Sequence, residues 1–557
     1  MIRAAVTAVI IVVATVLSTS SIQTAHASPA HDTYDIIVYG GTSAGVTAAI
    51  KASRLGKTTL LIEPTSHLGG LTTAGLGMTD AGNPAVIGGL AREFYRHIRK
   101  HYENDQAWIW EQRTQYPWMK KSDDALWRFE PSAAATVIHQ MLAATSVTVL
   151  TGHRLDLARW GTKTGTTITS IRMENGREFH ARLFIDATYE GDLMAKAGVS
   201  YHVGREANHI HGESLNGTQT AQATKHQFLL DIDPWRIPGD RTSGLLPTIQ
   251  PEAPGPDGTS DHRIQAYCYR LCLTDVPANR RPWTRPDGYD PQRYEIIRRY
   301  LAAGWSWQEM WRGHHLMPNR KSDTNNSGGF SSDHIGANYA YPDGDYDTRE
   351  TIVKDHEEYQ KGFWYFLATD PGVPAEVRAA VNEWGLPLDE FKETGGWPHA
   401  LYIREARRMV SDHIHTEMDC RGSRPTPDPV GMGSYAMDSH NTQRYVDARG
   451  FVRNEGDVQV PLDAPYPISY QSIRPRATEC INLLVPVCCA ASHIGYGSIR
   501  MEPVFMILGE SAATAASMAL DATTTVQNVP YPHLRARLLA DGQILEWKKP
   551  SPKAAQQ

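Results

Sequence analysis

The sequence predicts an α/β fold, with a parallel sheet covered by helices and an inserted α+β region. Two observations predict it. Residues 34–63 read as a strand, a glycine-rich turn, a helix and a second strand. Residues 482–520 read as a strand, a polar glycine-containing loop and an alanine-rich helix. Because alternating strands and helices are typical of parallel sheets, we expect both ends of the chain to build one domain.

Residues 1–27 have the layout of a secretory signal peptide. Arg3 precedes an apolar stretch at 4–17, and Ala25-His26-Ala27 stands before Ser28. The stretch is too short for a spanning helix, and no later run of about 18 apolar residues follows it. We therefore expect a secreted or periplasmic protein without a membrane span, whose mature chain begins near Ser28.

Composition argues against several other classes. The chain has 557 residues and a formal charge of −6 without a basic stripe, which argues against a nucleic-acid partner. The six cysteines form no CxxC motif. Four residues of strand would separate Cys268 from Cys272 by about 13 Å, too far for a disulfide. We expect free buried thiols and no metal site.

The first strand is expected at residues 34–40, an apolar run (YDIIVYG) suited to a buried parallel strand. Residues 46–56 then have helical spacing with small residues on one face, and Gly56 is a typical helix end. The run KTTLLIE at 57–63 supplies the next strand. Together they predict a Rossmann-like βαβ unit.

The turn inside this unit is a candidate phosphate site. Gly40 and Gly45 match the first and third glycines of the GxGxxG fingerprint, whereas Thr42 replaces the second. Free N–H groups at the helix N-terminus favour a pyrophosphate. Glu63 ends the next strand about 20 residues on, where a carboxylate accepts ribose hydroxyls. The alternative is a tight turn without a ligand.

Three further segments extend this interpretation. HLGGLTTAGLG at 67–77 packs glycines and threonines where the backbone runs close to a flat, bulky group. ARLFIDATYEGDL at 181–193 is another buried strand, followed by a polar turn. NLLVPVCCAASHIGYGSIRMEPVFMIL at 482–508 combines a strand, a loop and the start of a helix.

With these motifs the chain resembles the FAD-dependent oxidoreductases of the glutathione reductase type, with remote similarity to fumarate reductase flavoproteins. The resemblance covers nearly all of the mature chain and implies one FAD, bound without a covalent link. The segments GESLNG, YIREARRMV and GSYAMDSH belong to it as well. It implies that the N-terminus of the helix expected from about Pro503 stabilises the negative charge of reduced flavin.

The resemblance also assigns cofactor roles to residues. The pyrophosphate would lie on the glycine turn, at Gly40, Gly41, Thr42, Ala44 and Gly45. Glu63 would bind the adenosine ribose, and Leu155 would lie beside the adenine. Asp186 and the residues after Thr188 resemble the second FAD motif. The backbone beside the isoalloxazine ring would be that of Gly69, Gly70, Leu71, Thr72 and Thr73.

The sequence departs from these relatives in two ways. It contains no second GxGxxG in a strand–helix context, so a nicotinamide domain is missing. It also lacks paired cysteines after the first motif, which excludes glutathione reductase chemistry. We expect the electron acceptor to be oxygen, a quinone or a small carrier.

The predicted domain organisation is discontinuous. Residues 28–205 and 466–525 form the FAD-binding domain, 206–465 the substrate domain, and 526–557 a C-terminal tail. The longest helical patterns of the middle region lie at 290–311, 347–370 and 400–419.

Two groups of side chains in the middle region have competing interpretations. Trp305, Trp307 and Trp311 either stack on sugars or pack against a core, and packing is favoured. Arg404, Arg407 and Arg408 fall at helical spacing near Glu405. They either clamp a substrate carboxylate or form a solvated, salt-bridged helix face, and the solvated face is favoured.

Three residues are candidates for catalysis. His493 is the first choice for a general base, because its loop precedes the flavin-facing helix, and His440 is the second. The alternative for each is a structural histidine. Arg500 either neutralises reduced flavin, holds an anionic substrate or pairs with Glu502.

The expected activity is hydride transfer to FAD from a CH–OH group of a small-molecule substrate, carbohydrate-like or otherwise polar. Two alternatives stay open: reduction of an activated C=C bond with an arginine as proton donor, and a carbohydrate-binding protein with a vestigial flavin site.

Overall fold

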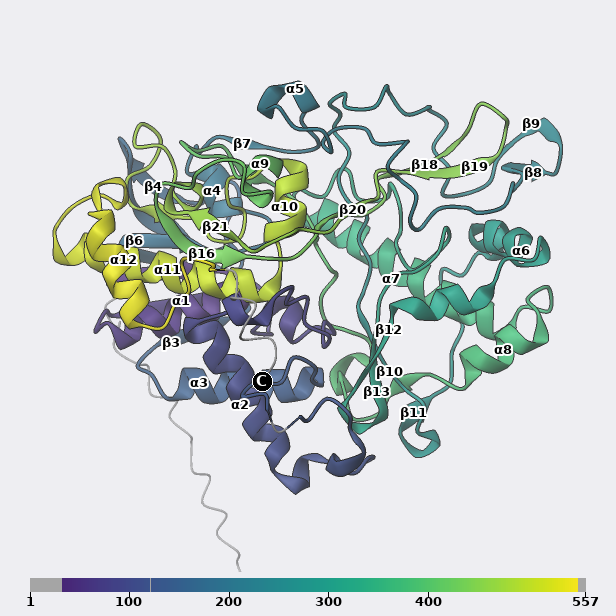
Figure 1. The fold of residues 1–557 in the computed structure, drawn as a ribbon, viewed down its shortest axis with the longest axis horizontal. Helices are drawn as coiled ribbons and strands as arrows, with labels where there is room; N and C mark the ends of the chain where they lie inside the picture. The colour runs from purple at the N-terminus through teal and green to yellow at the C-terminus, as the bar shows by residue number, and fades with distance from the viewer. Residues whose placement is uncertain (1–32, 121, 549–557) are drawn as a thin grey trace, which may run out of the picture. The chain divides into compact units, whose positions relative to one another are not determined.

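The computed structural model describes residues 33–120 and 122–548, which form one compact unit. The predicted signal peptide at 1–27 lies outside the described residues. The ribbon in Figure 1 shows the central sheet on the side of α11 (Glu502–Asp521) and α12 (Tyr531–Ala540). The middle of the chain lies on the side of α6 (Glu295–Ala302), α7 (Tyr346–Thr369) and α8 (Ala375–Asn382).

The main sheet has the strand order β3-β2-β1-β6-β5-β4, and β22 also pairs with β6. The pairs β1/β2, β1/β6, β2/β3 and β6/β22 are parallel, whereas β4 and β5 form an antiparallel edge. The strands are β1 (Thr33–Tyr39), β2 (Thr59–Glu63), β3 (Thr148–Thr151), β4 (Gly161–Thr164), β5 (Thr167–Arg172), β6 (Glu178–Asp186) and β22 (Leu483–Leu484). The predicted parallel sheet that draws on both ends of the chain is confirmed, although β22 covers only Leu483–Leu484.

Side-chain alternation along β1 explains why this strand is central. Ile36 and Val38 point into one hydrophobic core, and Ile37 and Tyr39 into the core on the other face. A strand buried on both faces reads as a continuous apolar run, which is why it was recognisable in the sequence.

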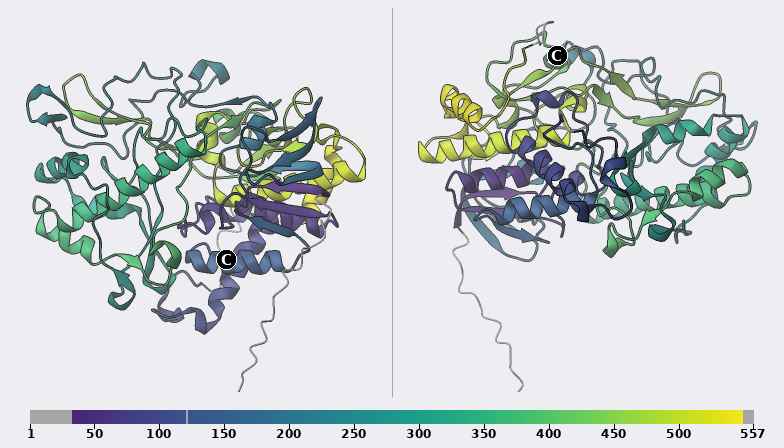
Figure 2. Two further views of the ribbon diagram at one scale, coloured as in Figure 1. Left: turned by 180° about the vertical axis from the view of Figure 1, so that it is seen from behind. Right: turned by 60° about the horizontal axis from the view of Figure 1, so that its bottom comes forward.

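Helix α1 (Ser43–Arg54) packs against α11 (Glu502–Asp521) along their length, as Figures 1 and 2 both show. A Cβ on Gly509 would come within 2.1 Å of the carbonyl oxygen of Ala44, so the two backbones nearly touch. The helix predicted after residue 46 and the helix expected near 503 are both confirmed, and Gly56 has the positive φ of a helix end.

The other helices and strands belong to loops, small sheets and the middle region. The helices are α2 (Gly89–Glu103), α3 (Pro131–Ala143), α4 (Asp192–Lys196), α5 (Asn208–His211), α6 (Glu295–Ala302), α7 (Tyr346–Thr369), α8 (Ala375–Asn382), α9 (Glu417–Cys420), α10 (His493–Ile499) and α12 (Tyr531–Ala540). The strands are β7 (Tyr201–His202), β8 (Trp235–Ile237), β9 (Asp240–Leu245), β10 (Leu271–Thr274), β11 (Arg280–Arg281), β12 (His314–Met317), β13 (Lys321–Thr324), β14 (Leu386–Pro387), β15 (Arg408–Met409), β16 (Pro429–Gly433), β17 (Met437–Ser439), β18 (Gln443–Val446), β19 (Val452–Glu455), β20 (Val458–Val460) and β21 (Tyr466–Ser469).

The middle region has a hydrophobic core of its own, with aromatic side chains from α6 and α7 and leucines from β10. Trp305 is buried in it and stacks on Tyr300, and Trp307 and Trp311 pack against it. The favoured interpretation of these tryptophans is confirmed. The domain boundaries drawn from the sequence stay a prediction.

The helical patterns of the middle region have three different outcomes. The pattern at 347–370 is confirmed as α7. The pattern at 290–311 is broken: α6 ends at Ala302, and a separate 3₁₀ segment, Trp307–Gly313, follows Gly304. The pattern at 400–419 is wrong, because the chain there is mostly extended and contains only β15 and the short α9.

The arginines of this extended segment are buried, so the favoured solvated helix face is wrong as well. Arg404 lies 2.9 Å from Asp333, and Arg408 lies 2.9 Å from Glu405 and 2.7 Å from Glu206. Buried carboxylates at many points of the chain compensate these charges, and a local helical spacing does not contain that information.

All six cysteines are buried and free, as expected. Among the described helices, α11 is long and apolar enough to cross a membrane, but 94 % of its most apolar window is buried inside the protein. Its apolar side chains therefore pack in the hydrophobic core.

Candidate active site

A cavity of about 310 Å³ opens at the carboxyl ends of β1 and β2. This edge of a parallel sheet is where α/β proteins bind ligands. Its wall combines the glycine turn, the end of β2, the polar turn after β6 and the segment 399–403. Prominent lining residues are Tyr39, Gly40, Thr42, Glu63, Gly70, Arg154, Thr188, Tyr189, Asp192, Tyr346 and Leu401.

The glycine turn has the geometry of an anion cradle. Gly40 has a φ of 99°, and a Cβ at Gly45 would lie 1.8 Å from the carbonyl oxygen of Gly40. The hydroxyl of Thr42 caps α1 by accepting from the N–H of Gly45, at 3.3 Å. Thr42, at the position of the fingerprint's second glycine, is therefore the N-cap of α1.

Three backbone donors of this turn have no acceptor among the described residues: the N–H groups of Thr42, Ser43 and Ala44. They stand at the first turn of α1, where the helix dipole favours negative charge. This is the arrangement that binds phosphate groups.

Glu63 ends β2 at the wall of the cavity. Its carboxylate accepts from the N–H of Gly41 at 2.6 Å and from the N–H of Thr65 at 2.7 Å. Burial raises the pKa of Glu63, although both hydrogen bonds act in the opposite direction. The carboxylate is thus fixed beside the glycine turn, in reach of the cavity.

Glu502, the first residue of α11, connects three segments. It accepts from the Tyr189 hydroxyl at 2.7 Å and from the Thr72 hydroxyl at 2.9 Å, and the Tyr189 oxygen accepts from the N–H of Leu71 at 3.0 Å. The structure therefore brings residues 70–73, the turn after β6 and the N-terminus of α11 together. Arg500 is not bonded to Glu502, so that predicted pairing is wrong.

Some residues predicted for the cofactor do not face the cavity. Leu155 is fully buried, and its N–H donates to the hydroxyl of Tyr39 at 2.9 Å. Asp186 is also buried, accepting from the N–H groups of Thr188 and Met194. Burial raises its pKa to about 6. Both residues support the cavity wall from behind.

A second cavity, of about 500 Å³, lies in the middle region. Its lining is mostly polar and comes from five separate segments. Among the lining residues are Lys225, His226, Gln227, Glu309, Arg312, His315, Asn325, Tyr435, Asp438, His440 and Gln459.

His440 is the predicted residue that faces this cavity. Its Nδ1 lies 2.9 Å from Asp333 Oδ2, and no hydrogen bond is made by its Nε2 among the described residues. Arg404 and His440 hold the pKa of Asp333 below its usual value against the effect of burial. Because an ionised carboxylate only accepts, Nδ1 carries the proton and Nε2 keeps its lone pair.

Burial, and then the charge of Arg404, lowers the pKa of His440 to about 4. The imidazole is therefore neutral at ordinary pH. A neutral histidine with a free nitrogen on a polar cavity has the properties of a general base.

His493 has a different setting. It begins α10 instead of lying in a loop, so the predicted loop is wrong. Its Nδ1 lies 2.8 Å from Glu405 Oε2 and its Nε2 lies 2.8 Å from the Ser439 hydroxyl. Both nitrogens are occupied, and the residue is buried. The catalytic role predicted for His493 stays a prediction, but this geometry favours His440.

Arg500 is buried between the two regions. It donates to the Tyr402 hydroxyl at 2.8 Å and to the carbonyl oxygen of Asp438 at 3.2 Å. It also lies 3.7 Å from the Asp438 carboxylate. Arg500 thus helps to position the strand that carries Asp438 and His440.

Residues 401–404 contact groups that belong to both sites. Leu401 and Ile403 line the first cavity. Tyr402 accepts from Arg500, and Arg404 is paired with Asp333, the partner of His440. The two faces of residues 401–404 therefore serve the two sites.

The sequence matches a family model described as FAD dependent oxidoreductase over residues 35–538. The chain belongs to this family. It is an FAD-dependent oxidoreductase, as the resemblance implied. No curated protein matches the sequence.

Solved structures similar to this FAD-dependent oxidoreductase cover about a third of it. L-proline dehydrogenase from P. horikoshii is 15% identical over 32% of this chain and 59% of its own, with a TM-score of 0.23. L-amino acid deaminase from Proteus vulgaris is 12% identical over 31% and 52%, with a TM-score of 0.22. A flavin-containing monooxygenase from Stenotrophomonas maltophilia is 16% identical over 34% and 45%, with a TM-score of 0.19. Scores this low carry no argument about substrate or mechanism.

The residues of the first cavity fit FAD. The free N–H groups of Thr42, Ser43 and Ala44 suit its pyrophosphate, and Glu63 suits the adenosine ribose. Gly70 and Thr188 line the same cavity, whereas Leu71 and Thr72 lie behind it.

Sequence reasoning missed several residues that line or support the two sites. Tyr39, Arg154 and Tyr346 line the FAD cavity. Tyr39 had a usable signal, because it is the last strand residue before Gly40. Asp333 is 107 residues from His440 and had none.

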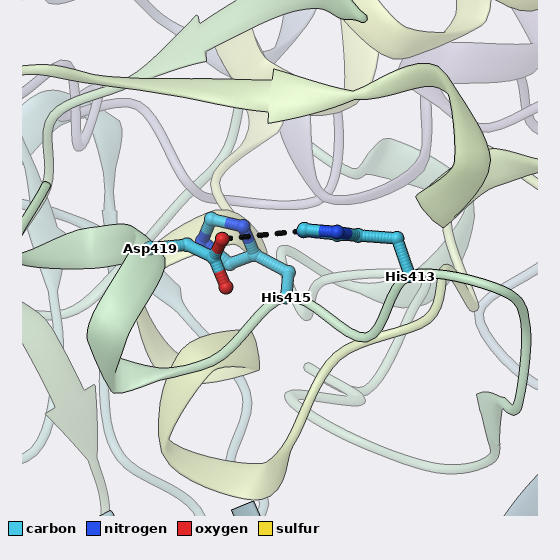
Figure 3. Close-up of side chains that lie close together, drawn as sticks. All are labelled: His413, His415 and Asp419. Carbon is cyan, nitrogen blue, oxygen red and sulfur yellow. Dashed lines mark ion pairs between the residues drawn. The ribbon is translucent and has the colours of Figure 1, made fainter. Parts of the chain in front are cut away.

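One further cluster lies outside both cavities. His413, His415 and Asp419 place potential ligand atoms within 4.8 Å of one another, and His413 lies 3.2 Å from Asp419 (Figure 3). Arg424 donates to both carboxylate oxygens of Asp419: Nε donates to Oδ1 at 3.0 Å, and Nη2 donates to Oδ2. Arg424 Nη2 also lies 3.2 Å from His413 Nε2. A guanidinium cation therefore already compensates this cluster, which carries no metal proposal.

Proposed function

We propose that this FAD-dependent oxidoreductase oxidises a CH–OH group of a carbohydrate-like or other polar small molecule bound in the second cavity. The observation that carries the proposal is the His440–Asp333 pair, with its free nitrogen on a polar wall. His440 takes the hydroxyl proton at Nε2, and Asp333 orients the ring and stabilises the imidazolium.

When bound, FAD would supply the acceptor for the hydride that leaves the carbon. The contributions of the chain are binding and proton transfer. Asp438, Asn325 and Gln459 offer hydrogen bonds to a polyhydroxylated ligand. Arg404 keeps Asp333 ionised, so the His440 tautomer with a free Nε2 is maintained.

The electron acceptor is proposed to be oxygen, a quinone or a small carrier. The absence of a second dinucleotide fingerprint supports this, because the stretch GTKTGTTI lies in the antiparallel hairpin of β4 and β5, without a following helix. Export to the periplasm or the medium is also proposed, on the N-terminal sequence alone.

Anaerobic mixing of the FAD-loaded protein with alcohols and enoates tests the proposal. We expect the flavin absorbance to bleach with a polyol or sugar. If alcohols leave the flavin oxidised and an enoate reoxidises prereduced protein, reduction of an activated C=C bond replaces the proposal. A purified, folded protein without a visible flavin spectrum would favour the vestigial site.

A further inference from the structure

We propose that Asp438 makes the second cavity specific for vicinal diols. Its carboxylate accepts a hydrogen bond from the hydroxyl next to the one that His440 deprotonates. The inference rests on the function proposed above and names the substrate class of that site.

Strand alternation brings the two side chains together. In β17, Met437 and Ser439 are fully buried on one face, whereas Asp438 and the following His440 both line the cavity. Residues i and i+2 of a strand share a face. The partner of Asp438 across the ladder is Gln459, which lines the cavity too.

The carboxylate of Asp438 has unused acceptor capacity. Its Oδ1 is buried without a hydrogen-bond partner among the described residues. Its Oδ2 lies 3.9 Å from His440 Nε2 and 3.7 Å from Arg500 Nη2, both beyond hydrogen-bond distance. Oδ2 makes no hydrogen bond among the described residues, so it is the oxygen that can accept one from a ligand in the cavity.

The site therefore presents two acceptors side by side, Nε2 of His440 and the carboxylate of Asp438. Two hydroxyls on neighbouring carbons supply one donor to each. A monohydroxy alcohol satisfies His440 alone and leaves the carboxylate unpaired. A site built to bind a hydroxyl rejects the analogue that lacks it.

The test compares matched pairs on the FAD-loaded protein: cis-1,2-cyclohexanediol against cyclohexanol, and methyl α-glucoside against its 2-deoxy and 3-deoxy analogues. Stopped-flow absorbance gives the rate of flavin reduction and its half-saturation, and the shift of the oxidised flavin spectrum reports binding without turnover. We expect half-saturation by the diol to be about 10- to 100-fold tighter than by its partner.

Asp438→Leu should weaken half-saturation by the diol about 10- to 100-fold, to near the value for the monohydroxy compound, and Asp438→Asn, which keeps one acceptor, should lie between the wild type and Asp438→Leu. Equal use of diols and monohydroxy compounds, or a vicinal amino alcohol bound more tightly than the diol, would overturn the inference and leave the proposed function standing. Failure of every alcohol to reduce the flavin would instead reject the proposed function.

Discussion

His440 Nδ1 lies 2.9 Å from the buried Asp333 Oδ2, and His440 lines a polar cavity. Arg404 lies 2.9 Å from the other oxygen of the same carboxylate. The chain Arg404–Asp333–His440 fixes both the charge of the acid and the tautomer of the base. The geometry makes the base a pre-oriented group, ready for proton transfer.

His440→Asn should keep FAD bound and slow flavin reduction by the true substrate about 10²- to 10⁴-fold, because a positioned general base contributes about that factor. Rapid-mixing absorbance measures the rate. Asp333→Asn should slow reduction as well, since the amide no longer holds the Nδ1–H tautomer. Reduction at the wild-type rate in His440→Asn would show that the base is elsewhere.

His493→Asn is the matched control. The substitution leaves Glu405 without its histidine partner, so we expect a loss of about 1–3 kcal/mol in unfolding free energy. The reduction rate per folded, FAD-loaded molecule should stay near the wild-type value. A large loss of rate with unchanged thermal stability would restore His493 as the base.

The pH dependence follows from the depressed pKa of His440. The base must be neutral to accept a proton, and its pKa is lowered to about 4. The reduction rate should therefore be flat at neutral pH and fall as pH drops through about 4, well below the usual histidine value near 6.5. A wild-type pH–rate profile whose acidic limb lies near pH 6.5, and which loses that limb in His440→Asn, would contradict the lowered pKa of His440.

Gly45→Val should abolish FAD binding, since even a Cβ at this position would lie 1.8 Å from the Gly40 carbonyl oxygen. The branched side chain separates α1 from β1 and displaces the free N–H groups. The flavin absorbance of the purified variant measures occupancy, with circular dichroism as the control for folding. A folded variant that stays yellow would reject the cradle.

Glu63→Ala should weaken FAD by about 1.5–3 kcal/mol with the fold retained, the range for a lost hydrogen bond to a charged group. Titration of the apoprotein with FAD, followed by fluorescence quenching, gives the dissociation constant. An unchanged constant would mean that the ribose is bound by other residues.

The βαβ unit was predictable because its determinants are local. An apolar run, a glycine turn and small helical residues lie within 30 neighbouring positions, and each acts through its own backbone conformation. Gly40, Gly45 and Glu63 therefore had recognisable roles before any tertiary contact was known. The same applies to α7, whose helical period is unbroken from Tyr346 to Thr369.

The catalytic side of the molecule was not predictable in this way. Arg404 to Arg408 have a helical spacing, yet tertiary ion pairs hold them in extended chain. His440 and His493 were equivalent candidates in the sequence. In the folded protein His440 has a free nitrogen at a cavity, whereas both nitrogens of His493 are bonded, to Glu405 and Ser439. The glycine cradle could be predicted from the sequence, because its turn depends on short-range backbone geometry, and the resemblance of several motifs to a known family implied the cofactor. The candidate base could be chosen only in the tertiary structure, because the pKa and tautomer of a buried histidine depend on charged residues from distant parts of the chain.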